Sequence, residues 1–471
     1  YNHPDFKEII KVSNQGSYPR FNRKAFERVK DLSPLTKEIF IKALKKILVL
    51  NPLFEEFLTV LRQMLLNDLD ENASRLDRDS RILLATHLSD YCFMTEFIFD
   101  VTEEEQSKVN ALRSRLESDP DAMADAACVS TFACYDLLAS LSSAAKIEEL
   151  HAKNEVMHDL IHAQISRVHE EREIAQDIPS LTAIEDEISQ KVREQYEEFP
   201  YPRWREVPKD VVTQECLTNE YKPADGAKVL IAGCGTGQEV VLHSYIWPHT
   251  DILAVDISRT SMAYAIGKTK DAGQENITYR HADILKLGEA LEPESFDHIS
   301  CGGVLHHMRD PLEGWKSLMG LLKPGGSMLI SLYSDTARQI IARTRQIIAD
   351  QGVANDRKSM LAFRRALPDL LSREDMMEMF NAVDFYTTSM FRDFIFHVQE
   401  HRFTIPQIAD ALEKFDLEFD RFLLPDPVLI RFRKRFPEDG SEHVLKNWEI
   451  FEKENPLTFA HMYSFLSRKK K

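Results

Sequence analysis

The stretch KVLIAGCGTGQEVV, residues 228–241, decides the fold of this chain. Residues 229–232 form an apolar run of the kind that a parallel strand buried on both faces requires. The glycines that follow let the backbone adopt positive φ and let a ligand approach the main chain. A helix that opens near Gln238 would offer its unpaired N–H groups to that ligand. These features predict a ligand site at the end of a central strand.

The spacing of acidic and glycine residues narrows the ligand to a nucleoside. A second buried run, residues 252–255, ends at Asp256, nineteen residues after Gly237, where a carboxylate accepts hydrogen bonds from ribose hydroxyls. Gln238 and Glu239 follow Gly237, so the late glycine that packs a pyrophosphate against the helix is missing. A ligand without phosphates therefore fits this turn better than a dinucleotide.

The next hundred residues keep the same order of strands and turns. A third strand is expected at 276–281, a fourth at 296–301, an active-site turn at 304–308 and a fifth strand at 328–332. The series resembles class I S-adenosylmethionine-dependent methyltransferases. The resemblance implies an α/β fold with a Rossmann-like seven-stranded sheet, whose last two strands are expected at 417–424 and 461–467.

The resemblance also implies S-adenosyl-L-methionine as the cofactor. It places an acidic residue, Asp283, on the adenine amino group. The residues expected at the cofactor are Gly233, Cys234, Gly235, Thr236, Gly237, Asp256, Ile257, Asp283, Ile284, Gly302, Tyr196, Tyr201 and Trp204.

The composition of the chain limits the kinds of partner and environment that we expect for it. The chain has 471 residues, enough for two or three domains, and a net charge of −17, which disfavours nucleic acid and favours a cationic protein surface. No apolar stretch reaches the length of a membrane span. The six cysteines lack paired metal spacing, which predicts reduced, buried thiols in a cytoplasmic protein. Because the chain begins at Tyr1 without a methionine, a fragment or a processed form stays open.

We expect two domains. Residues 1–180 should form a helical domain, with a cap and first-turn proline at Asn51-Pro52, a central helix at 82–99 and a capping box at Thr102-x-x-Glu105. This domain would either dock as a compact bundle on the catalytic domain or on a second subunit, giving a homodimer, or recruit substrate. Residues 181–471 should form the catalytic domain, with an insertion at 335–415 beside the carboxyl ends of the strands.

The two domains meet at an aromatic segment. Thr182-x-x-Glu185 predicts the start of a helix that stops at FPYPRW, residues 199–204, because proline cannot continue it. The segment resembles a cofactor lid of a bacterial subgroup of the family. Aromatic faces also attract a sulfonium or an ammonium by cation–π interaction. The alternative is a hydrophobic plug between domains.

The insertion contains His397-x-x-Glu400-His401, which matches an inverted zinc-protease pattern if it is helical. A zinc site would need a third ligand, and the cofactor fold already accounts for the chain, so we expect no metal. Substrate contact by Arg392, His397 and His401 and a role limited to hydrogen bonding are the remaining interpretations.

Methyl transfer from a sulfonium depends mainly on positioning. If the acceptor is a lysine amine, freeing its lone pair at pH 7 costs roughly 4 to 5 kcal/mol, which burial in an apolar pocket can offset. His307 is the first candidate to take a proton, with His306 and Tyr333 as alternatives. Backbone or solvent hydrogen bonding is the competing role for the histidine pair.

More narrowly, the chain resembles bacterial methyltransferases similar to rickettsial enzymes that methylate lysines of outer-membrane protein. The helical domain, the lid, the glycine turn and the insertion carry this likeness, but no tandem repeats are found. Three hypotheses follow: a methyltransferase acting on protein side chains such as lysine, a small-molecule methyltransferase, and a cofactor-binding scaffold without turnover.

Overall fold

The computed structural model describes residues 9–13, 20–69, 74–198, 200–206 and 223–471. The chain divides into two compact units, one made of Tyr1–Glu170 with Gly352–Phe396 and the other of Glu171–Gln351 with His397–Lys471. The middle of the expected insertion thus belongs to the helical unit, while its two ends belong to the catalytic unit. Phe199 and Cys216 lie outside the described residues.

The first unit is built almost entirely from helices. A short antiparallel pair, β1 (Val12–Ser13) and β2 (Arg20–Phe21), precedes them. The helices before the sheet are α1 (Arg23–Glu27), α2 (Glu38–Lys46), α3 (Pro52–Asn67), α4 (Arg78–Met94), α5 (Glu103–Ser118), α6 (Pro120–Ala124), α7 (Ala126–Phe132), α8 (Ala144–His151) and α9 (His158–Ile161). The expected caps are confirmed: the Asn51 side chain accepts from the backbone of α3, and Thr102 and Glu105 form a capping box on α5.

Residues 352–396 add α18 (Arg357–Leu370), α19 (Arg373–Asn381) and α20 (Thr388–Phe391) to this unit. Arg364 on α18 makes two hydrogen bonds, of 2.8 and 2.7 Å, to the carboxylate of Glu55 on α3. The hydroxyl of Ser389 donates to Glu96, and both residues are buried. These charge-assisted contacts explain why the segment folds with the helical unit despite its distance in sequence.

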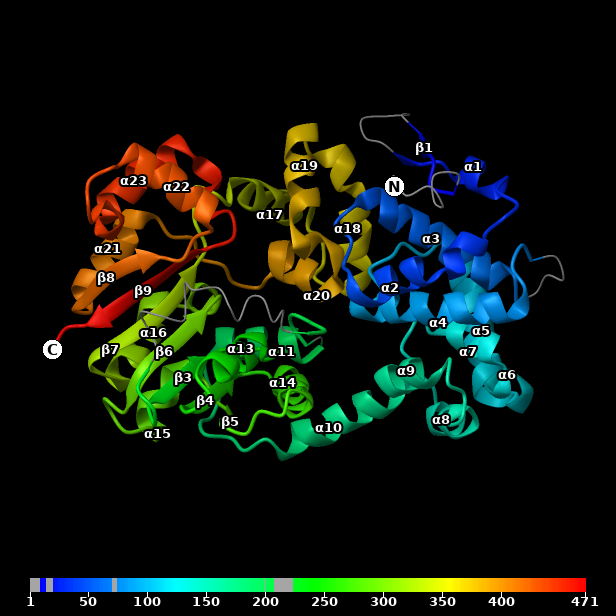
Figure 1. Cartoon of the computed structure of the whole chain (residues 1–471), viewed down its shortest axis with the longest axis horizontal. Coiled ribbons are helices and arrows are strands. Elements are labelled where there is room, and N and C mark those ends of the chain that lie inside the picture. The colour runs from blue at the N-terminus through cyan, green and yellow to red at the C-terminus, as the bar shows by residue number, and fades with distance from the viewer. Residues whose placement is uncertain (1–8, 14–19, 70–73, 199, 207–222) are drawn as a thin grey trace. The chain divides into compact units, whose positions relative to one another are not determined.

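The second unit contains a seven-stranded sheet in the order β5-β4-β3-β6-β7-β9-β8 among the described residues. Figure 1 shows it in green to red. Its strands are β3 (Lys228–Ala232), β4 (Asp251–Asp256), β5 (Ile277–His281), β6 (Phe296–Gly302), β7 (Leu322–Leu332), β8 (Leu417–Phe422) and β9 (Tyr463–Lys469). All neighbouring pairs are parallel except those of β9, which runs antiparallel to β7 and β8. The predicted Rossmann-like fold class is confirmed.

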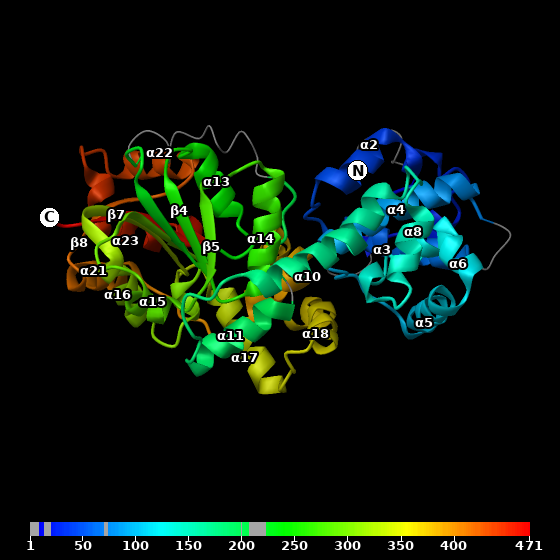
Figure 2. The same ribbon diagram turned by 90° about the horizontal axis from the view of Figure 1, so that it is seen from below.

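Both faces of the sheet are covered, as the apolar run of β3 requires. Val229 and Ile231 pack against α13 (Gln238–Ile246) and α14 (Arg259–Asp271). Leu230 and Ala232 face the opposite cluster, which contains side chains of α16 (Pro311–Leu321), α21 (Ile405–Lys414) and α23 (Leu445–Glu454). Figure 2 shows α13 and α14 on one side of the strands and α15 (Leu287–Ala290) and α16 on the other.

The remaining helices are α10 (Arg167–Asp177), within which the boundary between the units falls, α11 (Glu187–Glu198), α17 (Gln339–Gln351) and α22 (Asp426–Arg435). The predicted start of a helix at Thr182 is wrong, because α11 begins five residues later, at Glu187. Asp186 is the local reason: its Oδ1 accepts hydrogen bonds from the N–H groups of Ile188 and Ser189.

Two further expectations can be compared with the described residues. None of their helices is both long enough and apolar enough to cross a bilayer. Five cysteines are described, and all five are free thiols in buried positions: Cys92, Cys128, Cys134, Cys234 and Cys301.

Candidate active site

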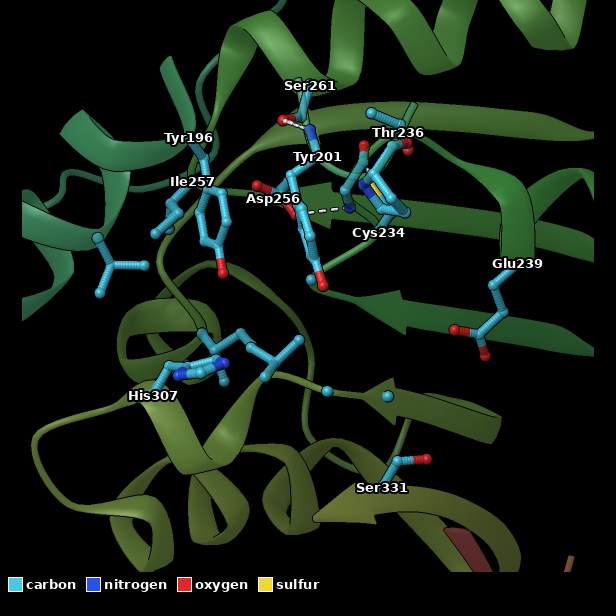
Figure 3. A pocket seen from close by; sticks show the side chains of 18 of the residues that line it. Tyr196, Tyr201, Cys234, Thr236, Glu239, Asp256, Ile257, Ser261, His307 and Ser331 are labelled. Atoms are coloured by element: carbon cyan, nitrogen blue, oxygen red, sulfur yellow. Dashed lines mark hydrogen bonds between the residues drawn. The ribbon is translucent and has the colours of Figure 1, made fainter. Parts of the chain in front are cut away.

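A cavity of about 590 Å³ opens at the carboxyl ends of the central strands of the catalytic unit. This volume lies within the range of small-molecule and cofactor sites. Nearly all of the residues expected at the cofactor line it. They are Gly233, Cys234, Gly235, Thr236, Gly237, Asp256, Ile257, Asp283, Ile284, Gly302, Tyr196 and Tyr201. Figure 3 shows the side chains around this cavity.

The turn after β3 needs its glycines for both conformation and space. Gly233 and Gly237 adopt φ of 82° and 80°, in the left-handed region that favours glycine. A Cβ at Gly233 would stand 2.3 Å from the side chain of Val304, and one at Gly237 would stand 2.6 Å from Cβ of Ala265. The turn therefore brings bare backbone to the cavity wall.

Asp256 ends β4 and is oriented by backbone donors. The N–H of Gly235 donates to its Oδ2 over 2.7 Å, and the N–H of Ser258 donates to Oδ1 over 2.8 Å. Figure 3 shows the first of these bonds crossing from the glycine turn. Burial outweighs these hydrogen bonds and raises the pKa of Asp256 to about 6. The carboxylate is thus held in place at the cavity wall and is ionised near neutral pH.

Asp283 follows β5 and is 2% exposed. Its Oδ1 accepts a 3.0 Å hydrogen bond from the N–H of Leu285, which caps the short helical turn behind it. Burial raises the pKa of this carboxyl as well. The neighbouring Ile284 adds an apolar surface to the same end of the cavity.

The aromatic segment lies against the glycine turn. The rings of Tyr196 and Tyr201 stack with centroids 5.5 Å apart, and both line the cavity. Trp204 does not line it; its Nε1 donates to the Thr236 carbonyl oxygen over 2.9 Å. The Thr236 hydroxyl in turn donates to the carbonyl oxygen of Pro202. The described part of the segment therefore covers the turn, with Trp204 as its anchor.

His307 lines the cavity from the turn after β6 and is 5% exposed. Its Nδ1 lies 2.8 Å from the carbonyl oxygen of Gln399, so Nδ1 carries the proton and donates. In the neutral ring the lone pair is then on Nε2. His397 stacks on His307 with ring centroids 3.6 Å apart.

The peptide of Gln399 fixes both rings of this stack. Its carbonyl accepts from His307, and its N–H donates to Nδ1 of His397 over 3.1 Å. In the neutral His397 ring the proton is therefore on Nε2, which lies 3.1 Å from the hydroxyl of Tyr196. Burial, and next the charge of a protonated His307, lower the pKa of His397 well below its ordinary value, so the neutral form is favoured.

The other expected residues lie away from the cavity lining. His306 is fully buried, stacks on Tyr333 with centroids 3.9 Å apart, and has no hydrogen-bond partner on either ring nitrogen among the described residues. Tyr333 lies beneath the guanidinium of Arg338. Arg392 belongs to the helical unit and donates to Asn355 there. His401 lies 2.9 Å from the side-chain amide of Gln399 and contacts the cavity only indirectly.

The zinc-protease pattern does not form its helix. Residues 397–403 form no helix, so the two histidines do not share a helical face. Glu400 instead pairs with Arg338 at 2.8 Å, with side chains only 3% and 5% exposed. The backbone of this segment runs along the strand ends, where the N–H of His401 donates to the His306 carbonyl and that of Phe403 to the Tyr333 carbonyl.

With this geometry in place, the comparison with known protein families becomes informative. Residues 223–381 match the family model of a methyltransferase domain. The seven-stranded, mostly parallel sheet agrees with the class I fold expected from the sequence. The chain carries a class I S-adenosylmethionine-dependent methyltransferase domain.

Relatives of this methyltransferase domain match only part of the chain. An uncharacterised protein of Synechococcus is 29% identical over 181 residues, 36% of this chain and 42% of the relative. A demethylmenaquinone methyltransferase of Staphylococcus aureus is 32% identical over 105 residues, 22% of this chain and 42% of the relative. Each match spans less than half the length of the relative. The structure of PKMT2 from Rickettsia typhi in complex with AdoHcy is similar at 18% identity and a TM-score of 0.38, covering 53% of this chain and 51% of that one.

The residues of the methyltransferase cavity suit S-adenosylmethionine. Carboxylates stand at the ends of β4 and β5, and none of the described lining residues is a lysine or an arginine. Such a lining attracts a cationic sulfonium and offers nothing to a pyrophosphate. The glycine pattern of the sequence and the lack of lysine and arginine among the described lining residues therefore both favour a ligand without phosphates.

Two features of the methyltransferase site were missed in the sequence. Gln399 acts through its backbone, for which no residue type gives a signal. Glu239 lines the cavity from the first turn of α13. Its position two residues after the last glycine could have revealed it, because a helix that opens at the turn must present its first-turn side chains near the ligand.

Proposed function

We propose that the protein transfers the methyl group of S-adenosylmethionine to an amine of a protein side chain, lysine first. One observation supports this: a single cavity is lined by the glycine turn, by the carboxylates of Asp256 and Asp283, and by His307. Asp256 would accept from the ribose hydroxyls and Asp283 from the adenine amino group. The rings of Tyr196 and Tyr201 would cover the sulfonium.

The bound cofactor supplies an electrophilic methyl group on a sulfonium. In the transfer the sulfur–methyl bond breaks, a nitrogen–methyl bond forms, and the sulfur keeps the bonding electron pair as a neutral sulfide. An amine that enters as an ammonium must lose one proton before it can attack. Nε2 of His307 is the atom that takes it, because Nδ1 is engaged as a donor to Gln399. The stacked His397 ring keeps His307 in this orientation.

The structure favours His307 over the two alternatives. His306 lies behind it, outside the cavity lining, and burial lowers the pKa of His306 well below its ordinary value. Tyr333 is covered on its faces by His306 and Arg338. Neither presents a basic atom to the cavity, so both are positioning residues in this proposal.

A small-molecule acceptor is the second candidate. His307 is only 5% exposed and one face of its ring is covered by His397, so the space beside it suits a compact acceptor. The relative of Staphylococcus aureus that matches over 105 residues is named a demethylmenaquinone methyltransferase, after an acceptor that is not a protein. A lysine side chain is narrow and flexible and ends in an amine, so it would also fit the restricted space beside His307.

Incubation of the protein with methyl-labelled S-adenosylmethionine and a cell lysate separates these candidates. Label in acid-precipitated protein supports the first, and label in the small-molecule extract supports the second. The His307→Ala variant serves as the blank, since it should lose nearly all of the labelled product, and Asp256→Ala should lower the product at limiting cofactor. Cofactor binding without any labelled product from the unaltered protein would point to a scaffold and contradict both candidates.

A further inference from the structure

Three carboxylates are found among the described residues that line the cavity. The proposed contacts to adenine and ribose use Asp283 and Asp256 and leave Glu239 without a role. Glu239 belongs to the first turn of α13, where a negative charge is favoured by the helix dipole. A carboxylate at a cavity wall nevertheless calls for a cationic or donor partner when a ligand enters.

One oxygen of Glu239 accepts a hydrogen bond from the protein, and the other, Oε2, has no hydrogen-bond donor among the described residues. The hydroxyl of Ser300 donates to Oε1. A Cβ built on Gly302 would stand 3.4 Å from Oε2 and 3.8 Å from the hydroxyl oxygen of Ser331. The missing side chain at Gly302 thus leaves a recess bordered by two oxygens. Figure 3 shows Glu239 and Ser331 at this end of the cavity, away from Tyr196 and His307.

The negative charge of Glu239 has no balancing cation among the described residues. Nδ1 of His243 lies 3.7 Å from Oε1, too far for a hydrogen bond. That ring is 1% exposed, and its burial lowers the pKa, so it stays neutral. The charge is therefore left for the ligand to balance.

The three carboxylates follow the order of the strands. Asp283 follows β5, Asp256 ends β4, and Glu239 reaches across to β6 through Ser300. Two strand spacings, about 10 Å, separate β4 from β6. The methionine chain of the cofactor leaves the ribose and ends at an α-carbon that carries an ammonium and a carboxylate, and in an extended form it covers such a gap. Adenine, ribose and ammonium would then meet one carboxylate each.

We propose that Glu239 binds the α-ammonium of the methionine tail of S-adenosylmethionine through Oε2. This inference rests on the proposed function, because it needs the cofactor in this cavity. The tail is then held at its far end, opposite the ribose carboxylate of Asp256. The sulfonium then lies between the contacts made by Asp256 and Glu239, and this limits the directions in which its methyl group can point.

Calorimetry with two ligands tests the assignment. S-adenosylhomocysteine carries the amino-acid tail, and 5′-methylthioadenosine shares the nucleoside but lacks the tail. Glu239→Gln should weaken S-adenosylhomocysteine at least tenfold and change methylthioadenosine less than twofold, because only the first ligand has the ammonium. Glu292→Gln, which removes the same charge from an exposed position, should change neither.

The outcomes divide cleanly. Glu239→Gln that weakens both ligands equally would show a role in the fold of the cavity, and unchanged binding of S-adenosylhomocysteine would remove Glu239 from the site. Either result overturns the inference and leaves the proposed function standing. If the unaltered protein binds neither ligand, the cofactor assignment itself fails and this inference fails with it.

Discussion

The two sides of the cavity are held in place by different means. On the cofactor side, Asp256 accepts from the N–H groups of Gly235 and Ser258, and Asp283 accepts from Leu285, all within or next to the strand ends. On the acceptor side, His307 donates to the carbonyl of Gln399, ninety-two residues later in the chain. The contacts on the cofactor side thus join residues that are close in sequence. The acceptor side depends on residues 397–403, which follow the part of the chain that belongs to the helical unit.

This difference indicates where the protein is specialised. The strands and the glycine turn are common to a fold that serves many reactions. The segment 397–403 positions the histidine stack and belongs to the long insertion. Changes to the cofactor side should therefore alter affinity for the nucleoside, and changes to the acceptor side should alter turnover or local stability. Each of the following predictions tests this division.

His307→Ala should give the largest effect. Loss of a positioned proton acceptor lowers turnover by about 100- to 10,000-fold. Affinity for S-adenosylhomocysteine should stay within about threefold, because the cofactor contacts are on the other side. Steady-state kinetics with the acceptor found in the labelling experiment measures the first, and calorimetry the second. The exposed His249→Ala is the control, and equal turnover in the two variants would contradict a role for His307.

Glu400→Gln tests the anchor of the acceptor side. The change leaves Arg338 buried without its charge partner, which should lower the free energy of unfolding by about 3 to 5 kcal/mol. Denaturant unfolding measures this loss. Replacing both partners, Arg338→Met with Glu400→Leu, should restore most of the stability, because no unpaired charge remains. A single variant as stable as the unaltered protein would mean that this pair does not anchor the segment.

The same division explains what the sequence could and could not reveal. Apolar runs followed directly by Gly233, Asp256 or Asp283 predict strand ends and ligand contacts, since strand and functional residue are neighbours in the chain. No local pattern shows that a peptide near residue 399 returns to His307. The helix that a zinc-protease pattern would need at 397–401 is not formed, and Glu400 pairs instead with buried Arg338.

The expected insertion also shows that a single sequence does not reveal which distant segments pack together. Its helices α18 and α19 carry buried residues at helical spacing, Met360, Phe363 and Leu367 in α18 and Met376 and Met379 in α19. Their association with the helical unit depends on contacts such as Arg364 with Glu55, which are 309 residues apart. Secondary structure is thus readable from local spacing, while the choice of packing partner is set by tertiary charge pairing that a single sequence does not display.

Asp256→Ala should produce a smaller but specific effect on the cofactor side. A charge-assisted hydrogen bond contributes roughly 1.5 to 3 kcal/mol, so affinity for S-adenosylhomocysteine should fall more than tenfold. The affinity for methylthioadenosine should fall by the same factor, because this ligand carries the same ribose. This joint loss distinguishes Asp256 from Glu239, whose replacement should affect only the ligand with the tail. Unchanged affinity by calorimetry would contradict the placement of the ribose.

The pH dependence of binding gives the most graded test of the cofactor side. Burial raises the pKa of Asp256 to about 6, so the carboxyl is ionised above that pH and gains a proton as the pH falls through it. Only the ionised form accepts from both ribose hydroxyls. Affinity for methylthioadenosine should therefore be constant above about pH 7 and fall about tenfold per unit below pH 6.

Asp256→Asn is the matched variant for this test, since its amide keeps the shape but cannot titrate. It should bind more weakly at neutral pH, yet its affinity should stay nearly level through pH 6. Asp283, whose pKa is also raised by burial, accounts for any slope that remains at lower pH. A variant that keeps the full slope of the unaltered protein near pH 6 would assign the titration to another group. In that case the raised pKa of Asp256 would have no part in cofactor binding, even if the carboxylate touches the ribose.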